Sequence, residues 1–218
     1  MPVERESPSA PEPIEALHIL VHPGFRSFFR RRHTKWNHTE EQLFDRFIEH
    51  AQRMTEHEIM ALLTYESPHG FSRRVRAHTE TGEDRLMQRI EELRNVLQRR
   101  LIILAGMKIL SGTTKERRDI FRVLQRVATG RGQPIDPSDI ETYVFGQEIH
   151  TCVPKAAQAL NIAYRLPFGT VVDLDLTHFD FHTQAQKKSI VDTDIPALEK
   201  KYNRVLFARL KLRLPESK

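Results

Sequence analysis

Cys152 is the only cysteine of the chain, and its sequence neighbourhood suits a reactive thiol. It follows the apolar run Thr142 to Gly146 and comes directly before a segment with helical spacing, in which Pro154 suits a first turn. A helix N-terminus carries partial positive charge and N–H groups, which favour a thiolate and can bind an oxyanion. We therefore predict that Cys152 is a nucleophile. The alternative is a small, buried apolar residue.

Further side chains that could take part in catalysis follow the other apolar runs. His22 comes directly after the run Ala16 to Val21, and Lys108 comes just after Leu101 to Met107. His22 could act as a base, or it could be a turn histidine bonded to backbone. Lys108 could stabilise developing negative charge, or it could be solvated. We assign substrate binding to residues at or near the same strand ends, namely Glu148, His150, Phe25 and Tyr65.

Metal and cofactor binding have no signature in the sequence. Suitable ligand atoms occur near predicted strand ends, but not at a recognised metal-ligand spacing. The residues concerned are Glu66, His69, His178 and His182. The chain also lacks G-x-x-x-x-G-K-[ST], and no G-x-G-x-x-G follows the first apolar run. We expect no metal ion and no cofactor.

One segment near the N-terminus combines cations with aromatic residues and contains no acidic residue. Single-strand nucleic-acid binders use this combination, so a nucleic-acid-associated module is one alternative function. A solvated loop whose phenylalanines pack on the domain is the other interpretation. The cations are Arg26, Arg30, Arg31, Arg32 and Lys35.

The apolar runs and the amphipathic segments alternate along the chain. We predict strands at residues 16–21, 58–65, 101–107, 142–146 and 169–176, and helices at 39–53, 83–100, 115–128, 153–166 and 196–210. This rhythm predicts an α/β fold, with a mostly parallel sheet of five or six strands and helices on both faces, in a three-layer, Rossmann-like arrangement. In such sheets, chemistry gathers at the carboxyl ends of the strands.

Composition indicates one folded domain. Apolar residues make up 39% of the chain and charged residues 29%, which is ordinary for a globular protein. Residues 1–14 are rich in proline and glutamate and are predicted to be a disordered tail; residues 15–212 form the domain and residues 213–218 a second tail. No apolar stretch is long enough for a membrane helix, and no signal peptide is recognisable, so we expect a cytoplasmic protein without membrane contact.

The segment YVFGQEIHTCVPKAAQALNIAYRLPFGTVVDLDLT resembles the signature region of the isochorismatase-like cysteine hydrolases. Members of that family show G-x-x-T-D-x-C-V-x-x-T-A, which is matched here by Gly146, Cys152, Val153 and Ala157. The resemblance implies an isochorismatase-like domain over residues 15–212. It also implies a nucleophilic Cys152, electrostatic support from Lys108 and a tendency to form homo-oligomers.

The family pattern is incomplete in this chain. Its first strand ends in a catalytic aspartate, whereas Val21 or His22 occupies that position, and Ile149 and His150 replace Thr-Asp before the cysteine. We infer that His22 could accept the thiol proton, since histidine activates cysteine in other enzymes. The leading prediction is a divergent cysteine hydrolase acting on a small amide or related acyl group. A catalytically silent domain that binds a small ligand or a partner is the alternative, beside the nucleic-acid module.

Overall fold

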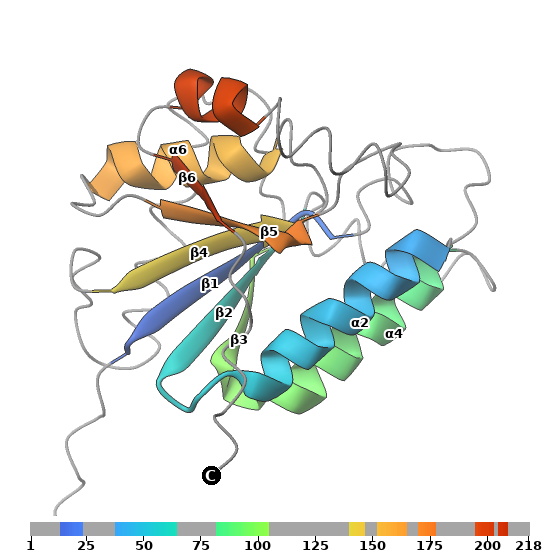
Figure 1. Cartoon of the computed structure of the whole chain (residues 1–218). Helices are drawn as coiled ribbons and strands as arrows, with labels where there is room; N and C mark the ends of the chain where they lie inside the picture. Colours follow the sequence, from blue (N-terminus) through green and yellow to red (C-terminus); the bar gives the residue numbers. More distant parts are fainter. Residues whose placement is uncertain are drawn as a thin grey trace, which may run out of the picture.

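The structure is a computed structural model, and it describes residues 14–23, 38–64, 82–104, 140–146, 152–164, 170–177, 195–202 and 205–208. Six parallel strands form one sheet in the order β3-β2-β1-β4-β5-β6 (Figure 1). The strands are β1 (Ala16–Val21), β2 (Glu58–Leu63), β3 (Leu101–Leu104), β4 (Glu141–Gly146), β5 (Thr170–Thr177) and β6 (Val205–Ala208). The predicted parallel α/β sheet of five or six strands is confirmed.

Helices α2 (His38–Arg53) and α4 (Gly82–Leu97) cover one face of the sheet. Each has an apolar stripe at helical spacing, such as Phe44, Phe47 and Ala51 on α2, and these stripes pack on the sheet. A short 3-10 helix, η1 (Gln98–Arg100), continues α4 into β3. The guanidinium of Arg100 donates hydrogen bonds to the carbonyls of Met54 and Thr55, just after α2 ends.

Helix α6 (Cys152–Tyr164) and the helix at residues 195–201 cover the opposite face. On α6, Val153, Ala156 and Leu160 are buried against the sheet, and Leu198 anchors the helix at 195–201 in the same cluster. The two helix layers enclose the sheet, so the three-layer arrangement predicted from the βαβ rhythm is confirmed (Figure 1).

The central strand β1 serves both cores. Leu17, Ile19 and Val21 belong to the cluster under α6, while Leu20 belongs to the cluster under α2 and α4. Successive side chains of a strand point to opposite faces, so a strand buried on both faces is apolar almost throughout. His18 is the polar exception on the α2 side of β1, and it is also buried.

Helices α2 and α4 are joined by an ionic network. Arg89 on α4 is only 8% exposed at its side chain and contacts three carboxylates: Asp45 and Glu41 on α2, and Glu92 on its own helix. Arg85, one turn earlier on α4, pairs with Glu41 as well. The network fixes the alignment of the two helices on one face of the sheet.

The C-terminal part of the chain differs from the prediction. The sequence predicts one helix over residues 196–210, whereas the helix ends at residue 201 and Val205–Ala208 forms β6. Strand β6 pairs with β5 from Thr170↔Val205 to Asp173↔Ala208, and this non-local pairing outweighs the local helix preference of the segment. None of the helices in the described ranges is long and apolar enough to span a membrane.

Candidate active site

The sheet reverses its winding between β1 and β4. From β1 the chain proceeds outward through β2 to β3, whereas from β4 it proceeds in the other direction through β5 to β6. In open parallel sheets, such a switch point leaves a crevice beyond the carboxyl ends of the two central strands, where ligands bind. The residues that follow β1 and β4 are therefore the first candidates for a site.

His22 directly follows β1 and is 1% exposed. Its backbone φ is 49°, in the left-handed region, which few non-glycine residues adopt and in which histidine is enriched. The His22 backbone N–H donates a 2.9 Å hydrogen bond to the carbonyl of Leu63, at the end of β2. The chain is thus held in a sharp, sterically costly turn at the carboxyl end of β1.

Gly146 ends β4 and pairs with Val21, the last residue of β1. Its φ of 150° is positive, and a Cβ at this position would lie 2.2 Å from the carbonyl oxygen of Val21. Only glycine fits so close an approach of two backbones. The glycine of the predicted motif therefore has a structural function, which is to let the chain leave β4 beside β1.

Strand β5 departs from regular pairing at the same edge. Val144 pairs with Val172, and Gly146 pairs with Thr177. The pairing thus advances by two residues on β4 but by five residues on β5. Thr177 is buried, and its Oγ1 donates a hydrogen bond to the carbonyl of Asp173. Irregularities of this kind redirect a strand near its end, here beside the end of β4.

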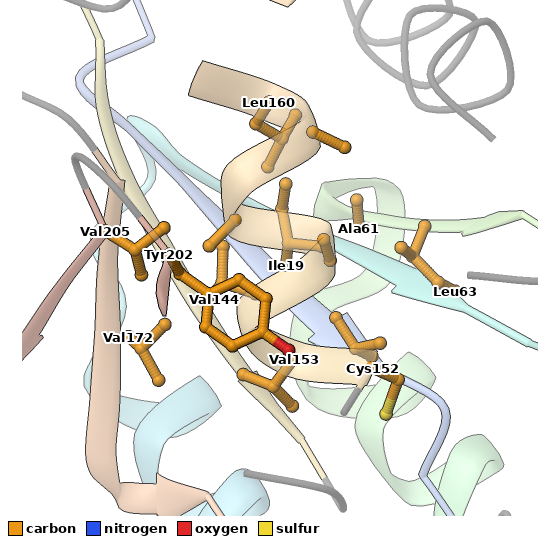
Figure 2. Close-up of a cluster of buried hydrophobic side chains, with 14 of the residues drawn as sticks. Ile19, Ala61, Leu63, Val144, Cys152, Val153, Leu160, Val172, Tyr202 and Val205 are labelled. Carbon is orange, nitrogen blue, oxygen red and sulfur yellow. The ribbon is translucent and has the colours of Figure 1, made fainter. Parts of the chain in front are cut away.

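Cys152 is the first residue of α6, one residue before the predicted start of this helix. Figure 2 shows it at the start of the helix, in the apolar cluster that also contains Leu63 and Val153. Its exposure is 3%, and it takes part in no disulfide. The cysteine therefore combines the position expected of a nucleophile with the burial expected of a small apolar residue.

His22 and Cys152 are the predicted site residues that the structure describes. They follow the two adjacent central strands, at the same edge of the sheet. The other predicted site residues, Lys108, Glu148, His150, Phe25 and Tyr65, lie outside the described residues, as do the cations Arg26, Arg30, Arg31, Arg32 and Lys35.

A second polar cluster, which the sequence analysis does not anticipate, lies on the α2 side of the sheet. It contains His18 of β1, His50 of α2 and Glu58 of β2. Burial, and secondarily the neighbouring His18, lowers the pKa of His50 from 6.5 to about 3. The polar contact with His18 lowers the pKa of Glu58. A histidine inside the apolar run ALHILV is the sequence signal that points to such a cluster.

No group of three or more His, Cys, Asp or Glu side chains in the described ranges is arranged to hold a metal ion. Scans against protein-family models, curated proteins and solved structures found no match to this chain. The resemblance to the isochorismatase-like hydrolases therefore stays a prediction from the residues around Cys152.

Proposed function

We propose that the chain is a divergent cysteine hydrolase, in which Cys152 attacks a small amide or related acyl substrate. One observation carries the proposal: Cys152 begins α6 after β4, and His22 makes a strained, buried turn after β1, the strand beside β4. Strained, buried polar residues concentrate at functional sites. The switch point of a parallel sheet is also where such folds bind ligands.

In the proposed reaction, His22 accepts the thiol proton as the Cys152 sulfur forms a bond to the acyl carbon. The carbonyl π electrons move to oxygen and then return as the C–N bond breaks, while the proton passes to the departing amine. The remaining thioester is hydrolysed by water, which restores the thiol and releases the acid. The reaction needs neither a redox partner nor a second substrate besides water.

The first turn of α6 supplies the oxyanion site in this mechanism. The first N–H groups of a helix have no carbonyl partner within the helix, and they lie at the positive end of its dipole. Pro154 has no N–H, so the backbone N–H of Val153 is the donor proposed for the oxyanion. By the sequence resemblance, Lys108 adds positive charge. Glu148, His150, Phe25 and Tyr65 are proposed to hold the substrate.

The test of the nucleophile is alkylation of the thiol by iodoacetamide over a range of pH. With a single cysteine, every labelled chain reports on Cys152, and the same chain unfolded in urea gives the rate of an ordinary thiol. We expect faster labelling in the folded chain than in urea at neutral pH, because the helix terminus stabilises the thiolate. Labelling slower than in urea at every pH would remove Cys152 as the nucleophile.

The test of the base is the variant His22→Asn. Asparagine tolerates the left-handed backbone conformation, so this change removes the imidazole without removing the turn. On any amide that the wild type hydrolyses, we expect kcat to fall about 10²–10⁴-fold. The matched control is His57→Asn in the turn before β2, which should keep the wild-type rate.

A catalytically silent domain that binds a small ligand is the second candidate. It is favoured by the 3% exposure of Cys152 and by the absence of an acidic residue at the end of β1. The experiment that separates the two candidates compares the wild type with Cys152→Ala on a broad panel of amides and esters. Hydrolysis that disappears in the variant supports the enzyme, whereas thermal stabilisation of both proteins by the same compounds without turnover supports the silent domain.

A further inference from the structure

The buried cluster formed by His18, His50 and Glu58 joins three elements at the amino-terminal part of the sheet. Nε2 of His50 lies 3.0 Å from Nδ1 of His18, and Nε2 of His18 lies 3.5 Å from a carboxylate oxygen of Glu58. His50 belongs to the last turn of α2, whereas His18 and Glu58 belong to the adjacent strands β1 and β2. The chain of contacts thus runs from the sheet to the helix.

Aromatic rings surround the two imidazoles. The His18 ring stacks on Tyr143 of β4 at a centroid distance of 5.2 Å, and the His50 ring meets Phe145 of the same strand edge-on at 5.4 Å. The His18 side chain is 5% exposed. An imidazolium in these surroundings would lose most of its hydration, which makes charging costly.

We assign the ring protons from the charges that face them. An ionised Glu58 only accepts hydrogen bonds, so we place the hydrogen of His18 on Nε2, which faces the carboxylate at 3.5 Å without meeting hydrogen-bond geometry. In a neutral His18 ring, Nδ1 is then an acceptor, and Nε2 of His50 is its donor. A neutral His50 keeps a bare Nδ1, which is buried and has no hydrogen-bond partner within the described residues.

A second proton would have to go to this bare Nδ1 of His50. The charged and titratable groups around it are His18 on β1, Glu58 on β2, and Arg53 on α2 itself. On β4, the hydroxyl of Tyr143 donates to Glu141, and on η1 Arg100 binds the carbonyls after α2. Among the described groups, Glu58 is the anion that attracts a charge on His50, and it already faces His18. Burial lowers the pKa of His50 more than the attraction of Glu58 raises it, so the pKa stays near 3.

The strands and the helix differ in how they can respond to a proton. His18 and Glu58 belong to the adjacent strands β1 and β2, where backbone pairing runs from Ala16↔Glu58 to Val21↔Leu63. His50 lies close to the end of α2, and its side chain is joined to the sheet by packing and by the contact with His18, without backbone pairing. Water therefore reaches the His50 ring at least cost when the last turns of α2 move away from the sheet.

We propose that the His18–His50–Glu58 cluster is an acid-sensitive latch, which holds α2 against the sheet at neutral pH and makes transient opening of the C-terminal half of α2 more frequent in mild acid. The proposal does not depend on the activity proposed for Cys152, which follows β4 at the carboxyl edge of the sheet. It makes α2, and not α6, the element that opens when a proton binds.

The test is hydrogen exchange of the full chain at pH 7.0 and pH 5.0, corrected for the intrinsic pH dependence of amide exchange. If opening restores the ordinary pKa of 6.5 to His50, the opening constant of α2 rises roughly 25-fold between the two values. Amides of α2 from Phe47 to Arg53 should show this loss of protection, while amides of α6 from Ala156 to Leu160 should not. Equal loss in both helices would overturn the latch, because it would indicate global unfolding.

Two variants test whether the imidazole of His50 causes the pH dependence of α2 protection. His50→Phe keeps an aromatic ring beside Phe145 but cannot titrate, so protection of α2 should become independent of pH over this range. His57→Phe removes a neighbouring histidine outside the cluster and should keep the roughly 25-fold change.

Nitrogen NMR of the wild-type rings gives a result even when a variant does not fold. We expect a bare Nδ1 on His50 at pH 7, and a His50 ring that stays neutral at pH 5. A His50 ring that titrates at its ordinary value in the folded chain would overturn the proposal.

Discussion

Gly146 and Val21 pair at the last register position that β4 and β1 share, immediately before His22 turns the chain out of the sheet. The backbone of Gly146 lies so close to the Val21 carbonyl that no side chain fits between them. The geometry of the switch point thus depends on this one contact. It fixes how β4 ends beside β1.

Gly146→Ala should destabilise the chain by about 2–5 kcal/mol, because the methyl group adds a backbone clash to a positive φ. Urea unfolding followed by circular dichroism measures the loss. Thr142→Ala on the same strand removes buried atoms without backbone strain and should cost about 1 kcal/mol. If Gly146→Ala costs no more than this control, β1 and β4 are not in the close contact described.

Phe47→Ala should cost about 3–5 kcal/mol, since it empties the centre of the cluster under α2. The Phe47 ring is fully buried, with its centroid 5.4 Å from that of Phe44 and 5.6 Å from that of Phe145. Leu206→Ala, at a side chain that is 50% exposed on the edge strand β6, serves as the comparison and should change stability by less than about 0.5 kcal/mol. Similar losses for the two variants would mean that α2 does not pack on the sheet as described.

Arg89→Gln should destabilise the chain by about 2–3 kcal/mol at low salt, because it removes the buried cation between three carboxylates, of which Glu41 and Glu92 still contact Arg85. The loss should shrink in 0.5 M NaCl, since salt screens the repulsion between Glu41, Asp45 and Glu92. Arg94→Gln is the matched control on the same helix. Arg94 is exposed, and among the described residues it pairs with Glu91 one turn away, so its loss should stay below about 0.5 kcal/mol. A loss for Arg89→Gln that does not change with salt would contradict the electrostatic account.

The central strands could be predicted from local pattern because their burial on both faces leaves an uninterrupted apolar run. Ala16–Val21 is found at the predicted bounds, and Glu58–Leu63 differs only at its end. Helices such as α2 could also be predicted from local pattern, through apolar stripes like the one that carries Phe44 and Phe47. Strand β6 could not be predicted in this way, since its four residues are too few to show a two-residue period.

The candidate site was predictable only in part. Cys152 and His22 could be singled out because each follows an apolar run, and parallel strands end at one edge of a sheet. The pairing of Gly146 with Thr177, and the contact between His18 and His50, depend on register and on helix packing. Those relationships are non-local, so no single window of the sequence contains them. His50 is an example. In the sequence it looks like an ordinary polar position of a helix, and only the packing of α2 on β1 shows that its partner is His18.

Glu58→Gln should lower stability at pH 7 by about 1 kcal/mol, with a loss that disappears as the solution becomes acidic. The folded chain holds the pKa of Glu58 below its ordinary value of 4.5, so the carboxylate adds stability above that pH. This contribution is lost as the pH falls below 4.5 through the lowered value, where the protonated acid and the amide become equivalent. Urea unfolding of both proteins from pH 7 to pH 3 measures the difference.

Glu56→Gln is the control for this titration. Its side chain is 81% exposed and lies 3.9 Å from His57, outside the cluster, so its effect should stay within about 0.5 kcal/mol at every pH. A Glu58→Gln loss that grows in acid would mean that the carboxyl is destabilised by burial more than it is stabilised by His18. In that case the folded chain would raise the pKa of Glu58 above 4.5, and the contact with His18 would not support the proton assignment along His18 and His50.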